Sequence, residues 1–103
     1  MARSYAVIWC DGGGPVHAGK LVFGHDTLRL EGSSRRHETS QAIRYKHLGG
    51  ERFSSVPERL RGLPTLLVEH GDGLRLAIAS LEGPGAIREL ASQLAGHATL
   101  SLA

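Results

Sequence analysis

Three residues near the N-terminus have side chains of the types that covalent catalysis uses. Cys10 has a thiol, Asp11 a carboxylate and His17 an imidazole, which are the nucleophile, orienting group and base of such sites. The thiol ends the apolar run 6–10, however, and a cysteine in an apolar strand is most often a small buried hydrophobic residue. No pair of carboxylates stands out for acid–base work either. We therefore expect no catalytic residues, and keep a small enzyme only as a second alternative.

A second pattern has the spacing of a phosphate-binding loop. Residues 14–20 read Gly, four residues, then Gly-Lys, but the next residue is Leu21 rather than the Ser or Thr that would hold magnesium. Such a loop must also lead into a helix whose N-terminal amides face the phosphate. The residues after Lys20 alternate with period two instead, so we expect a turn followed by a strand, and no cofactor.

Metal-ligating residues are present without a metal-site spacing. The chain has six histidines and one cysteine. The histidines lack the close paired spacing of a zinc site, and Cys10 has no partner for a disulfide. His25, His37, His70 and His97 lie in or beside predicted turns, and we interpret them as surface residues. We expect no metal ion, and a metal-binding protein joins the enzyme in the second alternative.

Basic side chains form the best candidate for a binding site. If the hairpin 16–31 and the strand 42–46 are adjacent, four basic residues share an exposed face, and the polar loop 32–40 adds two more. The candidate binding residues are Lys20, Arg29, Arg35, Arg36, Arg44 and Lys46. Such a face could attract anionic lipid or an acidic protein. The simpler alternative is a solvated face on which Glu31 pairs with Lys20 or Arg44.

The overall charge limits the class of partner. The formal net charge is +2, with seven Lys or Arg against four Asp or Glu in residues 1–50 and five against six in residues 51–103. This excess is too small to indicate nucleic-acid binding, so we expect no nucleic-acid partner. The chain has no apolar run of the roughly 20 residues that a membrane span requires, and no signal-peptide pattern. We therefore expect a cytoplasmic protein.

The elements that hold these side chains are mostly strands. The chain of 103 residues contains 14 Gly and 4 Pro, which is typical of short strands and tight turns, and its length predicts one domain, residues 1–103. Apolar and polar residues alternate with period two, the pattern of half-buried strands. The predicted strands are 6–11, 16–23, 27–31, 42–46, 52–54, 65–69 and 74–79. The polar stretch 32–40 is predicted to be a mobile loop, with a strand start near its end as the alternative.

Near the C-terminus the periodicity changes to that of a helix. Ile87, Leu90, Ala91 and Leu94 stand at i, i+3, i+4 and i+7, which predicts an apolar stripe on a helix at about 85–95 that ends at Gly96. One helix cannot cover both faces of an open sheet. The sequence therefore predicts a mainly β fold: a seven-stranded antiparallel barrel or orthogonal β-sandwich, with the helix capping one open end.

Several stretches carry a family resemblance. Residues 18–23 followed by 26–32, residues 43–48, and residues 66–69 with 73–78 resemble the strands of small bacterial pleckstrin-homology-like domains and the related GRAM-type modules. Residues 86–90 are similar to their capping helix, so the resemblance extends over residues 5–95 and implies the same barrel. The inositol-phosphate motif of the family is incomplete, because Thr27 and Glu31 flank Arg29 where basic residues would stand. Lipid-phosphate binding is therefore not implied.

The resemblance and the composition lead to one functional hypothesis. We expect a non-catalytic interaction module that binds a protein or peptide, by strand addition or through the basic first sheet. Homo-oligomerisation by strand pairing, through an exposed edge or the tail at Leu100 and Leu102, is a related hypothesis. The alternative is peripheral binding to anionic lipid head groups through the basic residues of the first sheet.

Overall fold

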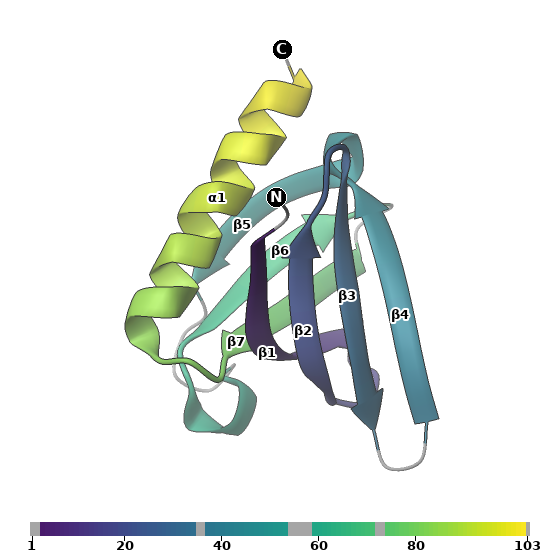
Figure 1. Ribbon diagram of the computed structural model, residues 1–103, viewed down its shortest axis with the longest axis vertical. Helices are drawn as coiled ribbons and strands as arrows, with labels where there is room; N and C mark the ends of the chain where they lie inside the picture. Colours follow the sequence, from purple (N-terminus) through teal and green to yellow (C-terminus); the bar gives the residue numbers. More distant parts are fainter. Residues whose placement is uncertain (1–2, 35–36, 54–58, 72–73, 103) are drawn as a thin grey trace.

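The computed structural model describes residues 3–34, 37–53, 59–71 and 74–102. Within this part of the chain, seven antiparallel strands form one sheet curled into a half-barrel, and one helix follows at the C-terminus (Figure 1). The strands are β1 (Arg3–Asp11), β2 (His17–Phe23), β3 (Thr27–Ser34), β4 (His37–Arg44), β5 (Leu48–Phe53), β6 (Thr65–His70) and β7 (Leu74–Ser80). The helix is α1 (Pro84–Leu102), and two 3₁₀ turns are η1 (Tyr45–His47) and η3 (Leu60–Gly62). The predicted mainly β fold with one C-terminal helix is confirmed.

The sheet consists of two meanders, β1 to β4 and β5 to β7, which are joined where β1 pairs with β7. Its strand order is β4-β3-β2-β1-β7-β6-β5, so the chain lays down β1 to β4 in sequence and then returns so that β7 pairs with the other side of β1. In Figure 1, β1 to β4 face the viewer and β7, β6 and β5 cross behind them. The two edges of the sheet, β4 and β5, are joined by η1.

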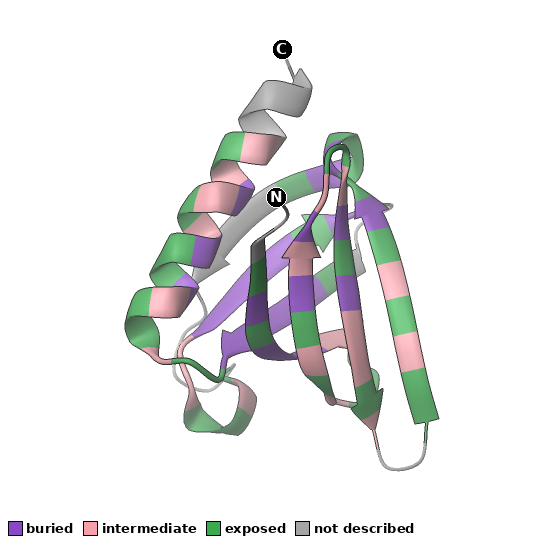
Figure 2. Cartoon of the chain, viewed as in Figure 1, coloured by how far each residue is buried: buried purple, intermediate pink, exposed green. Residues whose placement is uncertain are grey.

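The inner face of the curl holds the core. Because strand residues alternate between faces, every second side chain of β1, β2 and β3 points into the hollow, where α1 adds its apolar stripe. Figure 2 marks the buried residues of these strands and of α1 in purple. The core residues are Tyr5, Val7, Trp9, Leu21, Phe23, Leu28, Leu30, Ile43, Tyr45, Leu48, Leu66, Val68, Leu76, Ile78, Ile87, Leu90 and Leu94. Each large apolar side chain buried here contributes about 1.5–3 kcal/mol to folding.

The helix is longer than the sequence predicted. Gly96 was expected to end it, but α1 continues to Leu102, and the alternating tail 98–102 is helical. A glycine ends a helix when it adopts a positive φ, and Gly96 is not among the residues that do. A side chain at Gly96 would meet nothing within 4 Å, so this glycine lies on an open side of α1. In the described residues, no helix is both long and apolar enough to cross a membrane.

The polar stretch 32–40 is not the predicted loop. Here β3 continues to Ser34 and β4 begins at His37, and every residue from Thr27 to Ser34 has a partner between His37 and Arg44. The predicted strand 42–46 ends at Arg44, and Lys46 lies in η1. The prediction failed because backbone ladder bonds need no apolar side chains. The result is an eight-residue edge strand, β4, made mainly of polar residues.

The segment before β6 covers part of the outer face of the sheet. Thr65 is buried, with 1% of its surface exposed. Its hydroxyl accepts a hydrogen bond from the Leu60 amide and donates one to the Leu63 carbonyl, both at 2.9 Å. These bonds hold η3 on the outer side of β6, where it packs against β7. Ala77 and Ala79, whose side chains alternate to that outer side, are consequently buried as well.

The resemblance to a phosphate-binding loop has no structural counterpart. Gly12 and Gly13 adopt φ of 62° and 85° in a turn after β1, and the residues from His17 onwards form β2. Lys20 therefore extends from the middle of a strand rather than from a loop that leads into a helix. The predicted turn followed by a strand is confirmed.

Candidate functional site

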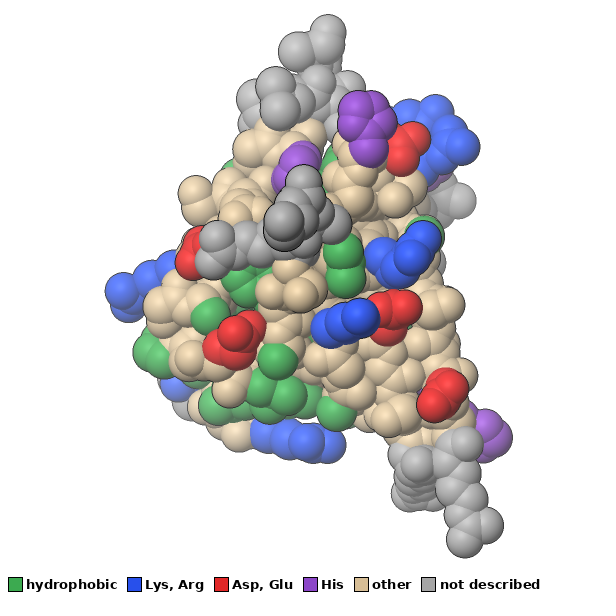
Figure 3. Space-filling model, viewed as in Figure 1, with side chains coloured by type: hydrophobic (Ala, Val, Ile, Leu, Met, Phe, Trp, Pro, Cys, Tyr) green, Lys and Arg blue, Asp and Glu red, His purple; other side chains and the backbone are tan. Residues whose placement is uncertain are grey.

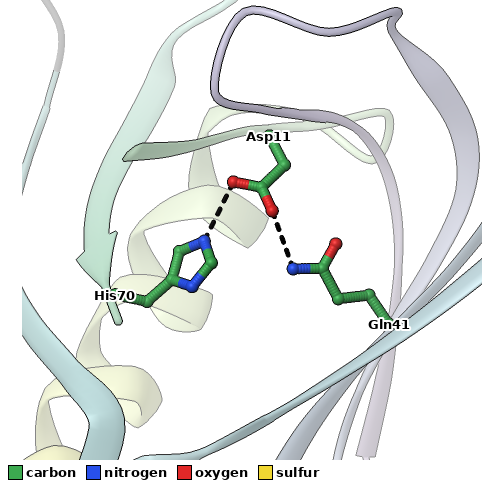
Figure 4. A network of polar contacts seen from close by, with 3 residues as sticks. All are labelled: Asp11, Gln41 and His70. Atoms are coloured by element: carbon green, nitrogen blue, oxygen red, sulfur yellow. Dashed lines mark hydrogen bonds and ion pairs between the residues drawn. The ribbon is translucent and has the colours of Figure 1, made fainter. Parts of the chain in front are cut away.

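The described structure contains a polar network inside the half-barrel, centred on Asp11 (Figure 4). One carboxylate oxygen, Oδ2, accepts a hydrogen bond from the Gln41 amide nitrogen Nε2 at 2.7 Å. The other, Oδ1, lies 2.9 Å from Nε2 of His70. Since a carboxylate only accepts, this imidazole nitrogen carries the proton. The network joins the end of β1 to the middle of β4 and to the end of β6.

Alternation along the strands explains why these three residues meet. Each of the three lies two residues from a core residue on its own strand, and residues two apart in a strand face the same way. The pairs are Asp11 with Trp9, His70 with Val68, and Gln41 with Ile43. All three side chains therefore point into the hollow. His70 is 7% exposed and the side chain of Asp11 23% exposed. The backbone ladder does not join β4 to β6, and the network bridges them through side chains.

The third member of the network decides what it can do chemically. An aspartate bonded to a histidine is the orienting half of many nucleophilic sites. Here the aspartate's second partner is the Gln41 amide, which is neither a nucleophile nor a base. The arrangement therefore clasps β4 to the rear strands. We call Asp11, Gln41 and His70 the Asp11 clasp.

The catalytic trio considered from the sequence does not assemble. Asp11 is engaged by His70 and Gln41, and the His17 ring packs on Trp9, with ring centroids 4.7 Å apart. Cys10 alternates to the opposite face of β1 from Asp11. Burial, reinforced by the negative charge of Asp11, raises the pKa of the Cys10 thiol, which keeps it in the poorly nucleophilic protonated form.

Trp9 anchors the same end of the hollow. Its indole nitrogen Nε1 donates a hydrogen bond of 3.3 Å to the Glu31 carbonyl oxygen. A Cβ atom at Gly32 would lie 3.1 Å from that nitrogen, so a side chain at position 32 would crowd the ring. Nδ1 of His17, whose ring packs on this indole, is buried without a hydrogen-bond partner.

The candidate basic residues are distributed over the outer face. Lys20, Arg29 and Arg44 are exposed on β2, β3 and β4, while Lys46 is exposed on η1. Arg35 and Arg36 lie outside the described residues. Lys20 pairs across the strands with Glu31 at 3.5 Å, as the simpler alternative required. Figure 3 shows acidic side chains interleaved with the basic ones on this side, so the described face carries mixed charge.

Two histidines interpreted as surface residues have other environments. His70 is buried in the clasp. His97 lies in α1, where its ring stacks on Tyr45 at 4.4 Å and on Phe23 at 5.1 Å. His25 and His37 are exposed, as expected. Among the residues that the structure describes, no three His, Cys, Asp or Glu side chains are placed to hold a metal ion.

The free edge of the sheet is a second feature that the sequence did not reveal. β4 pairs with β3 on one side and forms the end of the sheet on the other. Its register with β3 is regular over all eight residues. β5, at the opposite edge, has a register irregularity between Leu48 and Glu51 and contacts α1. Of the two edges, β4 is therefore the straighter and less covered.

Comparison with known proteins yields no relative for this chain: no protein-family model, no curated protein and no solved structure matches it. The fold is that of a small, mostly β domain with a half-barrel sheet and one C-terminal helix. The two features of the described structure that bear on function are the Asp11 clasp and the β4 edge.

Proposed function

We propose that this chain is a pleckstrin-homology-like domain that serves as a non-catalytic interaction module, and that it binds an extended protein or peptide segment along β4. The family proposal is supported by the order of elements, seven antiparallel strands in two meanders followed by one helix packed into the hollow. Because one fold supports many functions, the proposal for binding depends on a separate observation, the condition of the β4 edge.

The observation that carries the binding proposal is a regular, uninterrupted edge strand. Natural sheets guard their edges with charged side chains, lysine above all, or with proline, bulges or a covering element. In β4 the exposed charges Glu38 and Arg44 lie near the two ends and leave the middle of the strand uncharged. The sequence of β4, HETSQAIR, contains neither proline nor lysine, and its register has no irregularity. Every second residue of such a strand presents an unpaired N–H and C=O. An added strand would satisfy them, with about 1 kcal/mol of net stabilisation from each hydrogen bond.

The Asp11 clasp prepares this edge for binding. An edge strand has a neighbouring strand on one side and none on the other. It therefore loses conformational freedom when a partner binds, and this entropy loss weakens the affinity. Gln41, in the middle of β4, is fixed by its 2.7 Å bond to Asp11, and Asp11 is fixed by buried His70. The clasp therefore holds β4 in an extended shape before any partner arrives.

Peptide selection followed by hydrogen exchange tests the proposal. Peptides selected on the immobilised protein should protect amides of residues 37–44 and leave those of β7 unchanged. Protection centred elsewhere, or selection of no extended peptide, would contradict the proposal. Anionic vesicles are included in parallel, since binding to them that weakens with added salt would favour the basic outer face instead.

Two proline variants locate the bound strand. Amide direction alternates along a strand, so one of Thr39→Pro and Ser40→Pro removes an N–H that faces β3, and the other removes one at the free edge. Proline is tolerated at the free-edge position. That variant should keep the wild-type circular dichroism spectrum and lose peptide binding. If the free-edge variant folds and binds peptide as the wild type does, β4 is not the docking strand. If neither proline variant folds, hydrogen exchange of the wild-type protein with bound peptide decides the question.

A further inference from the structure

The charges along β4 are complementary to those of a second, antiparallel copy of β4. Glu38 and Arg44 are both exposed, and both lie on the outer face of the strand, near its opposite ends. Between them on that face are Ser40 and Ala42, which are small and exposed. Gln41, on the inner face, stands midway between the two charges. A copy of β4 running in the opposite direction would therefore bring an acidic end against a basic end at both ends.

We propose that the partner of β4 is a second copy of this chain, and that the two β4 strands pair antiparallel about a two-fold axis at Gln41. This inference depends on the proposed function, in which β4 is the docking edge, and it names the occupant. The sheet of one subunit would continue into the sheet of the other, and each edge would satisfy the backbone groups of its partner.

Strand geometry restricts the register of such a pair. In an antiparallel pair, two opposite residues either both turn their backbone groups toward each other or both turn them away. A two-fold axis must therefore pass at a residue, and each residue pairs with one of the same orientation. Axes at Ser40 and at Gln41 are the two that keep almost all of β4 paired.

Side chains distinguish these two registers. With the axis at Gln41, Glu38 lies opposite Arg44 of the partner subunit, on the same face, and this ion pair occurs twice. On the inner face, Thr39 lies opposite the partner subunit's Ile43, and β-branched pairs of this kind favour pairing. With the axis at Ser40, Glu38 would lie opposite Ala42 and no ion pair would form. The complementary charges therefore select the axis at Gln41.

Charge reversal tests the inference by sedimentation equilibrium. Glu38→Arg or Arg44→Glu puts like charges opposite each other at both ends, and should weaken dimerisation about tenfold, as expected for losing two cross-strand pairs. The double variant Glu38→Arg, Arg44→Glu exchanges the charges and should restore the wild-type dissociation constant. Arg29→Glu is the matched control, because Arg29 is equally exposed but lies on β3, and it should leave dimerisation unchanged.

Disulfide trapping tests the register independently. In a Cys10→Ser background, Ser40→Cys and Ala42→Cys chains mixed in a glutathione redox buffer should form a mixed disulfide dimer, because residues 40 and 42 lie opposite each other across the axis. Preferential formation of the Ser40→Cys homodimer would place the axis at Ser40 and overturn the proposed register.

The result can be separated from that of the proposed function. A wild-type chain that remains monomeric at all concentrations overturns the self-pairing inference, while peptide protection of residues 37–44 would leave β4 as a docking edge. A dimer that the double variant fails to restore also overturns the inference. If neither a dimer nor peptide protection of β4 is observed, both proposals are wrong.

Discussion

The front and rear strands of the curled sheet differ in how many of their faces are buried. In β2 and β3, buried inner residues alternate with exposed or half-buried outer residues over part of each strand. In β4, Ile43 alone is buried, and exposed residues alternate with half-buried Thr39 and Gln41. In β6, four successive residues from Thr65 to Val68 are buried, and in β7 Leu76 to Ser80 are buried as well. Figure 2 shows the contrast as alternating colours in front and continuous purple behind.

This difference separates the structural half of the sheet from the half that meets solvent. A strand buried on both faces contributes to stability and presents no surface, whereas an antiparallel strand with one solvated face can accept a partner. The rear strands are covered by α1 on one side, and η3 packs against β7. The front strands end in the free edge of β4. Binding is therefore expected in front, and sensitivity to mutation behind.

Two alanines test this comparison with the largest expected effect. Ala79 in β7 is fully buried, and Ala42 in β4 is exposed, although both lie on the outer face. Ala79→Glu forces a carboxylate into an apolar site and should lower the free energy of unfolding by about 3 kcal/mol or more. Ala42→Glu should change it by less than about 0.5 kcal/mol. Urea denaturation measures both, and equal losses would show that the rear outer face is not closed.

Two glycines test the packing of the front strands. A Cβ at Gly19 would overlap the Glu31 carbonyl oxygen and lie 2.5 Å from the Gly32 Cα. Since these are backbone atoms, Gly19→Ala should cost about 2–3 kcal/mol. Gly96→Ala is the control, because nothing lies within 4 Å of its Cβ position, and alanine in a helix interior should add about 1 kcal/mol of stability. Thermal denaturation should move the two variants in opposite directions; a stabilised Gly19→Ala would contradict the close strand approach.

The Asp11 clasp connects the two halves, and breaking it should affect them unequally. Asp11→Ala leaves the Gln41 amide and buried His70 without their partner, which should cost about 2 kcal/mol. Hydrogen exchange should increase in β4, which the clasp holds, and not in β7. Asp26→Ala removes an exposed carboxylate and is the control. Equal exchange in β4 for the two variants would show that the clasp does not position the edge.

Sequence periodicity predicted the strands whose inner faces are apolar, and it failed where the pattern is polar. Leu28 and Leu30 mark β3 because burial alternates with exposure, and the apolar run 66–68 marks β6, which is buried on both faces. From His37 to Ser40 no apolar residue marks the inner face, so β4 was placed too late in the chain. Pairing with β3 is a tertiary property, and only the register from Thr27 to Ser34 shows it.

The clasp depends on long-range contacts that local patterns do not contain. Asp11 and His70 are 59 residues apart, and Asp11 and Gln41 are 30 apart. One local signal was present: Asp11 is in phase with buried Trp9, and a polar residue in phase with a buried face needs a partner. The identity of that partner follows only from the way the sheet curls.

The smallest expected effect concerns Cys10, whose strand, β1, borders both halves. Burial raises the pKa of its thiol, and Asp11 raises it further, so the unfolded chain loses this proton at a lower pH than the folded chain. Above about pH 8, where a free thiol begins to ionise, the unfolded state binds fewer protons and stability must fall as pH rises. Cys10→Ser should make the melting temperature less dependent on pH in this range.

A second titrating group must be separated from this effect. Burial also raises the pKa of Tyr45, and the charge of Asp26 raises it further. Ionisation of Tyr45 therefore also lowers the stability as pH rises, but this loss begins nearer pH 10, where tyrosine ionises. Tyr45→Phe should therefore flatten the upper part of the curve, and Cys10→Ser the lower part. If Cys10→Ser follows the wild-type curve throughout, the outer side of β1 is open to water at Cys10, and the covered outer face of this strand ends at Ile8, which is 1% exposed.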